Sequence, residues 1–209
     1  RAPPAPCRSV WMESAALRVA DKFPDRLKVI LASASPRRKQ LLEDAGYHVT
    51  CIVSGADEIE DHSFPPAGLA LENAARKAGV VAGKFPDQTV IAADTVVWKA
   101  GRFFGKPSDM GDAFRMLKEL DGHTHEVGTG VVIHFPGGKI MAFSESSLVT
   151  FHALSNDGIR QYLASIHPLD KAGAYAAQDH DGSIIKKIEG SVTNVIGLPV
   201  ERVRDILAL

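Results

Sequence analysis

The chain has 209 residues, with 24 Lys and Arg against 25 Asp and Glu, so its formal net charge is −1 when histidine is neutral. A protein that coats nucleic acid normally has a basic excess, and an acidic solvating tail has the opposite imbalance, so this charge argues against both classes. Apolar residues make up 45% and charged residues 23%, as in ordinary globular domains. No apolar run approaches the roughly 20 residues of a membrane-spanning helix. We therefore expect neither a nucleic-acid partner nor a membrane.

The N-terminal end differs from the rest in composition. Residues 1–6 (RAPPAP) are proline-rich and cannot hold a helix or a central strand. We therefore predict an N-terminal extension at residues 1–26 and a single domain at residues 27–209. Cys7 and Cys51 lack a CxxC spacing, which favours free thiols in a reducing compartment. The extension contains no apolar run of the signal-peptide kind, so the cytoplasm is the expected location.

Strands and helices alternate in the first half of the domain. The apolar run at residues 29–32 predicts a strand buried on both faces. Ser35 and Pro36 have the residue types that cap and begin a helix, and Gly46 ends that helix. The next predicted elements are a strand at residues 47–53, a helix at 69–83 and a buried strand at 90–93. Asp94 and Thr95 follow this buried run, and residues 96–98 continue the strand to a turn at 99–101.

The second half combines helices with a long hairpin. The predicted elements are a helix at 109–120, two strands at 127–135 and 139–151 joined at 136–138, a helix from Ser155 to about residue 165, and a last helix after Pro199. Strands that alternate with helices, together with a hairpin, predict an α/β or α+β fold with a mixed sheet.

The best local candidate for chemistry is the turn at residues 33–38 (SASPRR). A helix N-terminus offers free N–H groups and a positive dipole end to an anion. Arg37 and Arg38 add forked donors that match phosphate oxygens, and Ser33 adds a hydroxyl. Arginines in the first turn oppose the helix dipole, so binding of an oligophosphate would explain them. A serine-capped helix with solvated arginines is the alternative.

A second candidate is Asp94, at the end of a predicted buried strand. Ligands collect outside the carboxyl ends of strands in open α/β sheets, and a carboxylate there can orient water or hold a divalent ion. Glu58 could supply a second metal-binding oxygen, although a solvated acidic loop explains the run at residues 57–61 as well. Lys77 and Lys106 are candidate phosphate partners, and each alone is more often a surface lysine.

The remaining motifs do not indicate a functional site. No GxxxxGK[ST] loop occurs, and residues 128–130 (GTG) open a predicted strand and not a helix, so neither phosphate-binding loop is present. His123 and His125 alternate in a predicted strand without a third ligand at metal spacing, which indicates a structural role. Residues 179–182 (DHDG) lack the calcium-loop pattern and predict a turn.

The motifs together resemble the Maf family of nucleoside triphosphate pyrophosphatases. The similarity covers residues 31–42 (LASASPRRKQLL), 72–78 (ENAARKA), 93–95 (ADT), 105–107 (GKP), 170–178 (DKAGAYAAQ) and 189–199 (EGSVTNVIGLP). Only the N-terminal extension lies outside it. The resemblance implies an elongated mixed sheet flanked by helices, in two lobes with a central cleft, as in the Maf/ITPase-like fold. It makes residues 27–209 one Maf-like catalytic domain, and it suggests a homodimer.

The resemblance also implies an activity and its residues. The expected reaction is hydrolysis of a nucleoside triphosphate to monophosphate and pyrophosphate with Mg²⁺ or Mn²⁺. Asp94 resembles the family's proton acceptor, and Lys106 and Glu58 are expected to join it in catalysis. The polyphosphate cradle is expected from Ser33, Arg37, Arg38, Lys77 and Lys106, and the metal ligands from Glu58 and Asp94.

Three positions bear on the substrate. Arg37, Thr95 and Gln178 resemble the subgroup that acts on dTTP and UTP, where modified pyrimidine nucleotides are further candidates, and differ from the 7-methyl-GTP subgroup. The Gln178 amide can pair with the O4 and N3–H edge of uracil or thymine. The acidic residues after Gln178 depart from the family pattern. The alternatives are a nucleotide-binding regulator of cell division without significant turnover, a 7-methyl-GTP-type pyrophosphatase, and a phosphatase that releases inorganic phosphate.

Overall fold

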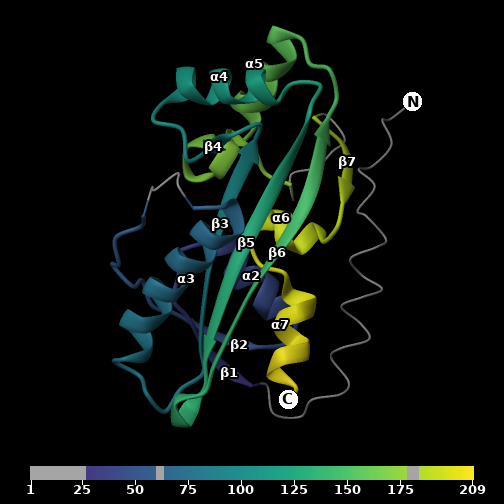
Figure 1. Ribbon diagram of the computed structural model, residues 1–209. Helices are drawn as coiled ribbons and strands as arrows, with labels where there is room; N and C mark the ends of the chain where they lie inside the picture. Colours follow the sequence, from purple (N-terminus) through teal and green to yellow (C-terminus); the bar gives the residue numbers. More distant parts are fainter. Residues whose placement is uncertain (1–26, 60–63, 178–183) are drawn as a thin grey trace, which may run out of the picture.

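The computed structural model describes residues 27–59, 64–177 and 184–209 (Figure 1). Its centre is a seven-stranded mixed sheet with the order β2-β1-β3-β5-β6-β7, and β4 pairs with β3. The strand β1 is parallel to β2 and β3, and the remaining pairs are antiparallel. The strands are β1 (Lys28–Leu31), β2 (His48–Cys51), β3 (Val90–Lys99), β4 (Arg102–Phe104), β5 (Thr124–His134), β6 (Ile140–Phe151) and β7 (Ile185–Glu189). The helices are α2 (Pro36–Asp44), α3 (Pro66–Ala82), α4 (Met110–Leu120), α5 (Asn156–Ser165), α6 (Val192–Ile196) and α7 (Val200–Leu207). The predicted mixed sheet with flanking helices is confirmed.

The central strands supply a separate core to each face of the sheet, because successive side chains of a strand point to opposite faces. Ile91 of β3 packs in one cluster with Leu42 of α2 and Val203 of α7. Its neighbour Ala92 belongs to the cluster that holds Ala74 of α3. In Figure 1, α3 accordingly lies across one face of β3 and β5. The apolar run at residues 90–93 of β3 therefore reflects burial on both faces of the sheet, and the predicted buried strand is confirmed.

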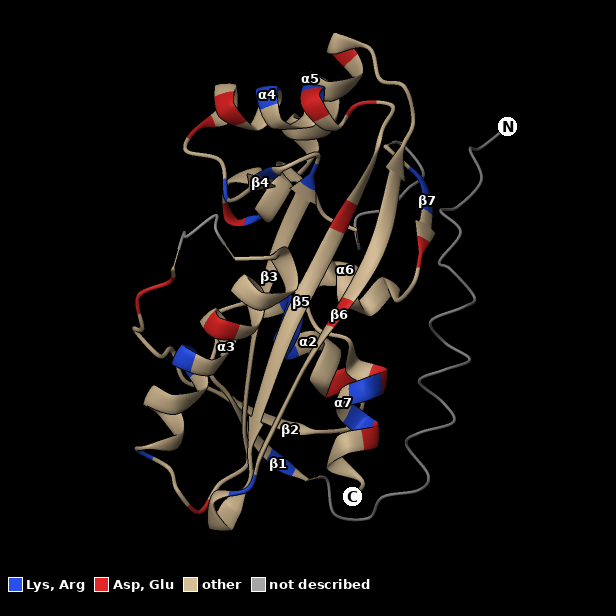
Figure 2. Cartoon of the chain, viewed as in Figure 1, with Lys and Arg blue, Asp and Glu red and all other residues tan. Residues whose placement is uncertain are grey.

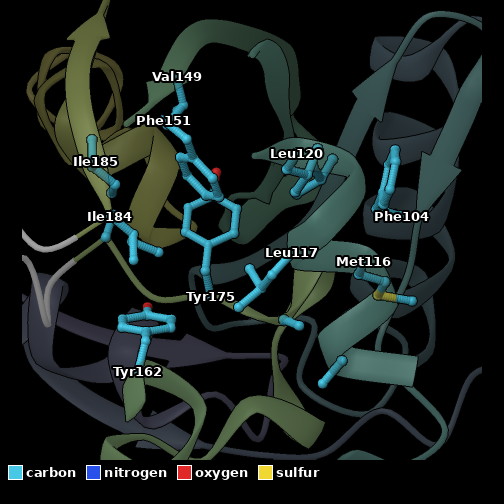
Figure 3. Packing of buried hydrophobic residues seen from close by; sticks show 14 of the residues in the cluster. Phe104, Met116, Leu117, Leu120, Val149, Phe151, Tyr162, Tyr175, Ile184 and Ile185 are labelled. Atoms are coloured by element: carbon cyan, nitrogen blue, oxygen red, sulfur yellow. The ribbon is translucent and has the colours of Figure 1, made fainter. Parts of the chain in front are cut away.

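A third core lies at the other end of the sheet, under α4 and α5 (Figure 3). Leu117 of α4, Tyr162 of α5 and Ile185 of β7 belong to it. The rings of Phe151 and Tyr175 meet edge to face with centroids 5.0 Å apart, an arrangement that aromatic quadrupoles favour. The sheet therefore extends from the two clusters beside α2, α3 and α7 to this third cluster beside α4 and α5.

The helix α3 approaches the sheet closely at Gly130 of β5. A Cβ atom at this position would lie 2.4 Å from the backbone nitrogen of Leu71 and 2.5 Å from the carbonyl carbon of Ala70. Only glycine permits such a contact between two backbones. The segment that was expected to open a strand is thus interior to β5, where it lets α3 lie directly on the sheet.

Several boundaries differ from the sequence-based expectations. The strand expected at residues 47–53 is His48–Cys51, because it pairs only with the four residues of β1. The helix expected from residue 69 begins at Pro66, where proline fits the first helical turn. The sequence did not predict β7 and α6: β7 is a short edge strand with adjacent lysines, and α6 has five residues.

Some expectations concern residues outside the described ones. They are the extension at residues 1–26 with Cys7, the turn at residues 179–182, and Gln178. Cys51 is described, and its thiol is free and exposed. Among the described helices, none combines the length and the apolar character that crossing a membrane requires.

Candidate functional site

The site lies at a gap in the sheet beside β3. The ladder between β1 and β3 ends at the pair Leu31 and Ile91, and the ladder between β3 and β4 begins only at the pair Val97 and Phe104. Between these pairs β3 is bonded to β5 on its other side. A cavity of about 950 Å³ opens at the gap, lined by the segments that follow β1, β2 and β4 and by the middle of β3. Ligands bind at such places because several strand ends deliver side chains there.

The turn after β1 is the segment that the sequence predicts to bind an anion. Ser35 caps α2, since its hydroxyl accepts a hydrogen bond from the Arg38 backbone N–H at 3.4 Å, and Pro36 is the first helical residue. The Ser33 hydroxyl accepts from the Ser35 backbone N–H at 3.1 Å and from Arg38 Nη1 at 3.3 Å. The first turn of α2 contains no acidic residue. The positive end of the helix therefore faces the cavity together with two arginines. In Figure 2 the basic residues of α2 lie near the middle of the molecule.

The two arginines are held in different ways. Arg37 lies 3.5 Å from the carboxylate of Asp170 and 3.3 Å from its backbone oxygen, across the cavity in the segment Pro168–Asp170. Arg38 donates from Nε to the carbonyl of Gly197 at 2.8 Å and from Nη2 to Thr95 Oγ1 at 3.0 Å. Burial lowers the pKa of Arg38, and the negative charges of Asp94 and Glu58 offset part of that decrease. The guanidinium stays protonated. Arg38 is therefore the more rigid cation.

An acidic pole faces this cationic pole. Asp94 of β3 and Glu58 of the segment after β2 both contact Lys77 of α3, with distances from Nζ of 2.7 Å and 2.6 Å. The side chains of Lys77 and Asp94 are 11% and 12% exposed and that of Glu58 is 45% exposed. Partial burial would raise the pKa of Glu58, but the hydrogen bond and charge of Lys77, with the charges of Lys106 and Arg38, outweigh burial and lower it. Lys77, expected in the phosphate cradle, thus bridges the two carboxylates.

Asn73 is a site residue that the sequence did not single out. Its Oδ1 accepts a hydrogen bond from the backbone N–H of Ile59 at 2.7 Å, and its Nδ2 donates to the Ile59 carbonyl at 3.1 Å. Nδ2 also lies 3.3 Å from Oδ2 of Asp94. Asn73 therefore fastens the segment that carries Glu58 to α3 and orients Asp94. The available signal was its position four residues before Lys77, on the same helix face.

The remaining predicted residues occupy different places. Lys106 follows β4 and lies exposed at the cavity wall. Thr95 lines the cavity, but its hydroxyl contacts Arg38 at 3.0 Å and Thr129 Oγ1 at 3.0 Å. Gln178 lies outside the described residues. The structure thus brings together eight of the nine candidates on one cavity, all except Gln178, namely Ser33, Arg37, Arg38, Glu58, Lys77, Asp94, Thr95 and Lys106.

The described residues fit a divalent cation in one particular way. They contain no group of three or more His, Cys, Asp or Glu side chains suited to a metal ion. Two carboxylates, however, lie within 2.7 Å of a shared cation, the Lys77 ammonium. Mg²⁺ is commonly bound by one or two carboxylates together with substrate phosphates and water. The donor set therefore fits a cation that arrives with a phosphorylated ligand.

The two histidines are apart from this site. His123 is exposed and precedes β5. His125 is buried, and its Nε2 lies 2.8 Å from the hydroxyl of Tyr175, a residue that also lines the cavity. Further apolar residues line the cavity; they are Val97, Phe103, Phe104, Val127, Ala176, Ala177, Val195 and Ile196. The cavity therefore combines a charged region with an apolar region.

Comparisons with known proteins show which proteins this chain resembles. The family model for Maf-like proteins matches residues 28–209. A dTTP/UTP pyrophosphatase of Akkermansia muciniphila is 46% identical over 180 residues, which cover 86% of this chain and 93% of that protein. A dTTP/UTP pyrophosphatase of Pelotomaculum thermopropionicum is 42% identical, with 86% and 95% covered. Among solved structures, the Staphylococcus aureus Ham1 protein aligns with a TM-score of 0.49 at 16% identity, over 87% of this chain and 98% of that one.

Proposed function

Because the chain belongs to the Maf family, we propose that it is a hydrolase of acid anhydrides, a nucleoside triphosphate pyrophosphatase that acts on dTTP and UTP. The observation that carries this proposal is the single cavity that holds a cationic helix terminus, with Arg37 and Arg38, opposite the carboxylate of Asp94. Relatives that are 42% and 46% identical over most of their length carry the name dTTP/UTP pyrophosphatase.

In the proposed reaction a water oxygen attacks the α-phosphorus and the bond from that phosphorus to the α–β bridging oxygen breaks. The proton of the water passes to Asp94, and pyrophosphate leaves with the electron pair of the broken bond. Asp94 accepts from Lys77 and Asn73, which occupy two of the roughly four acceptor positions of a carboxylate and leave others for water. Phosphoryl chemistry depends mainly on such positioning and on charge neutralisation.

Each charged side chain has a distinct part in this mechanism. Arg37, Arg38 and Lys106, with the Ser33 turn, would neutralise the leaving pyrophosphate. Lys77 would hold Glu58 and Asp94 close to each other through its two contacts. Glu58 and Asp94 would hold Mg²⁺ or Mn²⁺ together with the phosphates, and the cation would supply further neutralisation of charge on the phosphate oxygens.

Base recognition is proposed to come from Gln178, whose amide offers both a donor and an acceptor to the O4 and N3–H edge of a pyrimidine. The apolar wall near Tyr175 would contact the faces of the ring. The hydroxyl of Thr95 is committed to Arg38 and Thr129, so Thr95 would act on the arginine and not directly on the base.

A panel of nucleoside triphosphates with Mg²⁺ or Mn²⁺, in which pyrophosphate and phosphate are both measured, tests the proposal. We expect pyrophosphate from dTTP and UTP, and retained nucleotide binding with little turnover in Asp94→Asn. The exposed Asp87→Asn variant is the matched control. Nucleotide binding without turnover would favour a regulatory protein, release of inorganic phosphate would favour a phosphatase, and preference for 7-methyl-GTP would place the chain in the other subgroup. Near-wild-type turnover by Asp94→Asn would show that Asp94 is not the base.

A further inference from the structure

The geometry of Arg38 depends on groups that lie behind the cavity. Three of its five N–H donors are committed, to the Gly197 carbonyl at 2.8 Å, to Thr95 Oγ1 at 3.0 Å and to Ser33 Oγ at 3.3 Å. Within the part of the chain that the structure describes, one N–H on each terminal nitrogen is left for a ligand. The positions of Thr95 and of the Gly197 carbonyl therefore determine where these two N–H groups of Arg38 point.

Thr129 of β5 determines the direction of the hydrogen bond at Thr95. The Thr129 hydroxyl donates to the backbone carbonyl of Asn194 at 3.0 Å. A hydroxyl has one proton, so at the 3.0 Å contact between the two threonines Thr95 is the donor and Thr129 the acceptor. The oxygen of Thr95 then accepts from Arg38. The hydrogen bonds run in one direction, from Arg38 through Thr95 and Thr129 to Asn194.

The same threonine also fixes the second acceptor of Arg38. The Asn194 carbonyl belongs to α6, and Gly197, at the end of α6, has a φ of +128° and presents its carbonyl to Arg38. The Asn194 side chain donates to the Val127 carbonyl at 2.9 Å and to Ser147 Oγ at 3.0 Å. Both Thr129 and Asn194 are fully buried. The helix that carries one Arg38 acceptor is thus tied to β5 through Thr129.

We propose that Thr129 is a positioning residue for the reaction, which acts through Thr95 and α6 to aim the free N–H groups of Arg38 at the polyphosphate. The proposal rests on the proposed function, in which Arg38 contacts the leaving pyrophosphate. Without the Thr129 hydroxyl, the other acceptor of Thr95 is the Gly197 carbonyl at 3.5 Å, so the Thr95 hydroxyl is no longer held from the side of β5.

Substitutions at Thr129 separate its hydroxyl from its methyl group. Thr129→Val removes the hydroxyl at similar volume, and Thr129→Ser keeps it. We expect Thr129→Val to lower kcat/KM for dTTP about tenfold or more, since hydrogen bonds to charged groups are among the stronger ones. Thr129→Ser should restore the value to within about threefold. Thr124→Val is the matched control, because Thr124 lies on the same strand and pairs with Thr150 at 2.8 Å on the exposed surface.

A double-mutant cycle tests whether the effect passes through Arg38. If it does, Thr129→Val should lower kcat/KM much less in an Arg38→Ala background than in the wild type. Equal losses in both backgrounds, an unchanged kcat/KM in Thr129→Val, or a Thr129→Ser variant as impaired as Thr129→Val would each overturn the proposal. Urea unfolding of every variant shows whether the measured protein is folded.

Binding of inorganic tripolyphosphate, measured by calorimetry, distinguishes this proposal from the proposed function. If the wild type releases no pyrophosphate, the proposed function is wrong, while binding still reports on Arg38. We then expect Thr129→Val, and not Thr129→Ser, to weaken tripolyphosphate binding about tenfold. Equal affinity in wild type and Thr129→Val would overturn the positioning role on its own.

Discussion

The buried His125 makes the free energy of unfolding depend on pH. Its Nε2 contacts the Tyr175 hydroxyl at 2.8 Å, and its Nδ1 is buried without a hydrogen-bond partner among the described residues. Protonation would therefore place an unpaired N–H and a charge in an aromatic core that includes Phe151. Burial first, and the charge of Lys99 second, lower the pKa of His125 to about 4. The folded chain thus keeps the imidazole neutral at pH values where the unfolded chain protonates it.

The lowered pKa of His125 determines both the sign and the size of the change in unfolding free energy with pH. Because the pKa is lower in the folded state, the stabilisation is complete above the unfolded value near 6.5 and is lost as the pH falls toward 4. Between pH 7 and pH 5 the loss due to His125 is about 2 kcal/mol. The slope of one protein sums over every group that titrates in this range, so the informative quantity is the difference between two proteins that differ only at His125.

Urea unfolding of wild type and His125→Gln at pH 7 and pH 5, followed by circular dichroism, measures that difference. The wild type should lose about 2 kcal/mol more than His125→Gln, because glutamine does not titrate. His123→Gln, at an exposed position two residues earlier, should follow the wild type. An equal pH dependence in wild type and His125→Gln would refute the assignment of a neutral, buried imidazole.

Three further substitutions test other features. Asn73→Ala should lower kcat/KM about 10- to 100-fold in steady-state assays, because the segment that carries Glu58 loses its anchor, while the exposed Asn156→Ala should have no effect. Gly130→Ala should lower the free energy of unfolding by about 3 kcal/mol or more in urea, whereas Gly128→Ala, with its nearest neighbours at 3.7 Å, should change it by less than about 1 kcal/mol; equal effects would contradict the close crossing of α3. Gln178→Glu should reduce the preference for dTTP over guanine nucleotides at least tenfold in competition assays, and an unchanged preference would remove Gln178 from base recognition.

Local sequence patterns predicted α2, β3 and the turn before α2, which carry part of the site. The Ser35 cap, the proline start of α2 and the apolar run of β3 are short-range patterns, and each is in its expected place. The charged edge strand β7 and the short helix α6 were missed, because neither has the length or the periodicity that identifies an element.

The interactions within the site were less predictable, because they join residues far apart in the chain. Lys77 was recognised as a candidate, but its place between Glu58 and Asp94 depends on how α3 lies on the sheet. Thr129 and Asn194 are 65 residues apart in the sequence. Sequence spacing therefore indicated which side chains carry chemistry, whereas the packing of α3 and α6 on the sheet determines which of them touch.

The long strands have a mechanical consequence for the cleft. β5 and β6, with 11 and 12 residues, run without interruption past the gap where β1 has ended and β4 has not begun (Figure 1). The two strands are hydrogen-bonded to each other along the whole length of β5 behind the cavity. No flexible linker in these strands separates the parts of the sheet on either side of the cavity. Opening the cleft would require bending hydrogen-bonded strands. The spacing between Arg38, which Thr95 of β3 holds, and Asp94 of the same strand is therefore set when the sheet folds. Adjustment to a ligand falls to surface segments such as the one that carries Glu58.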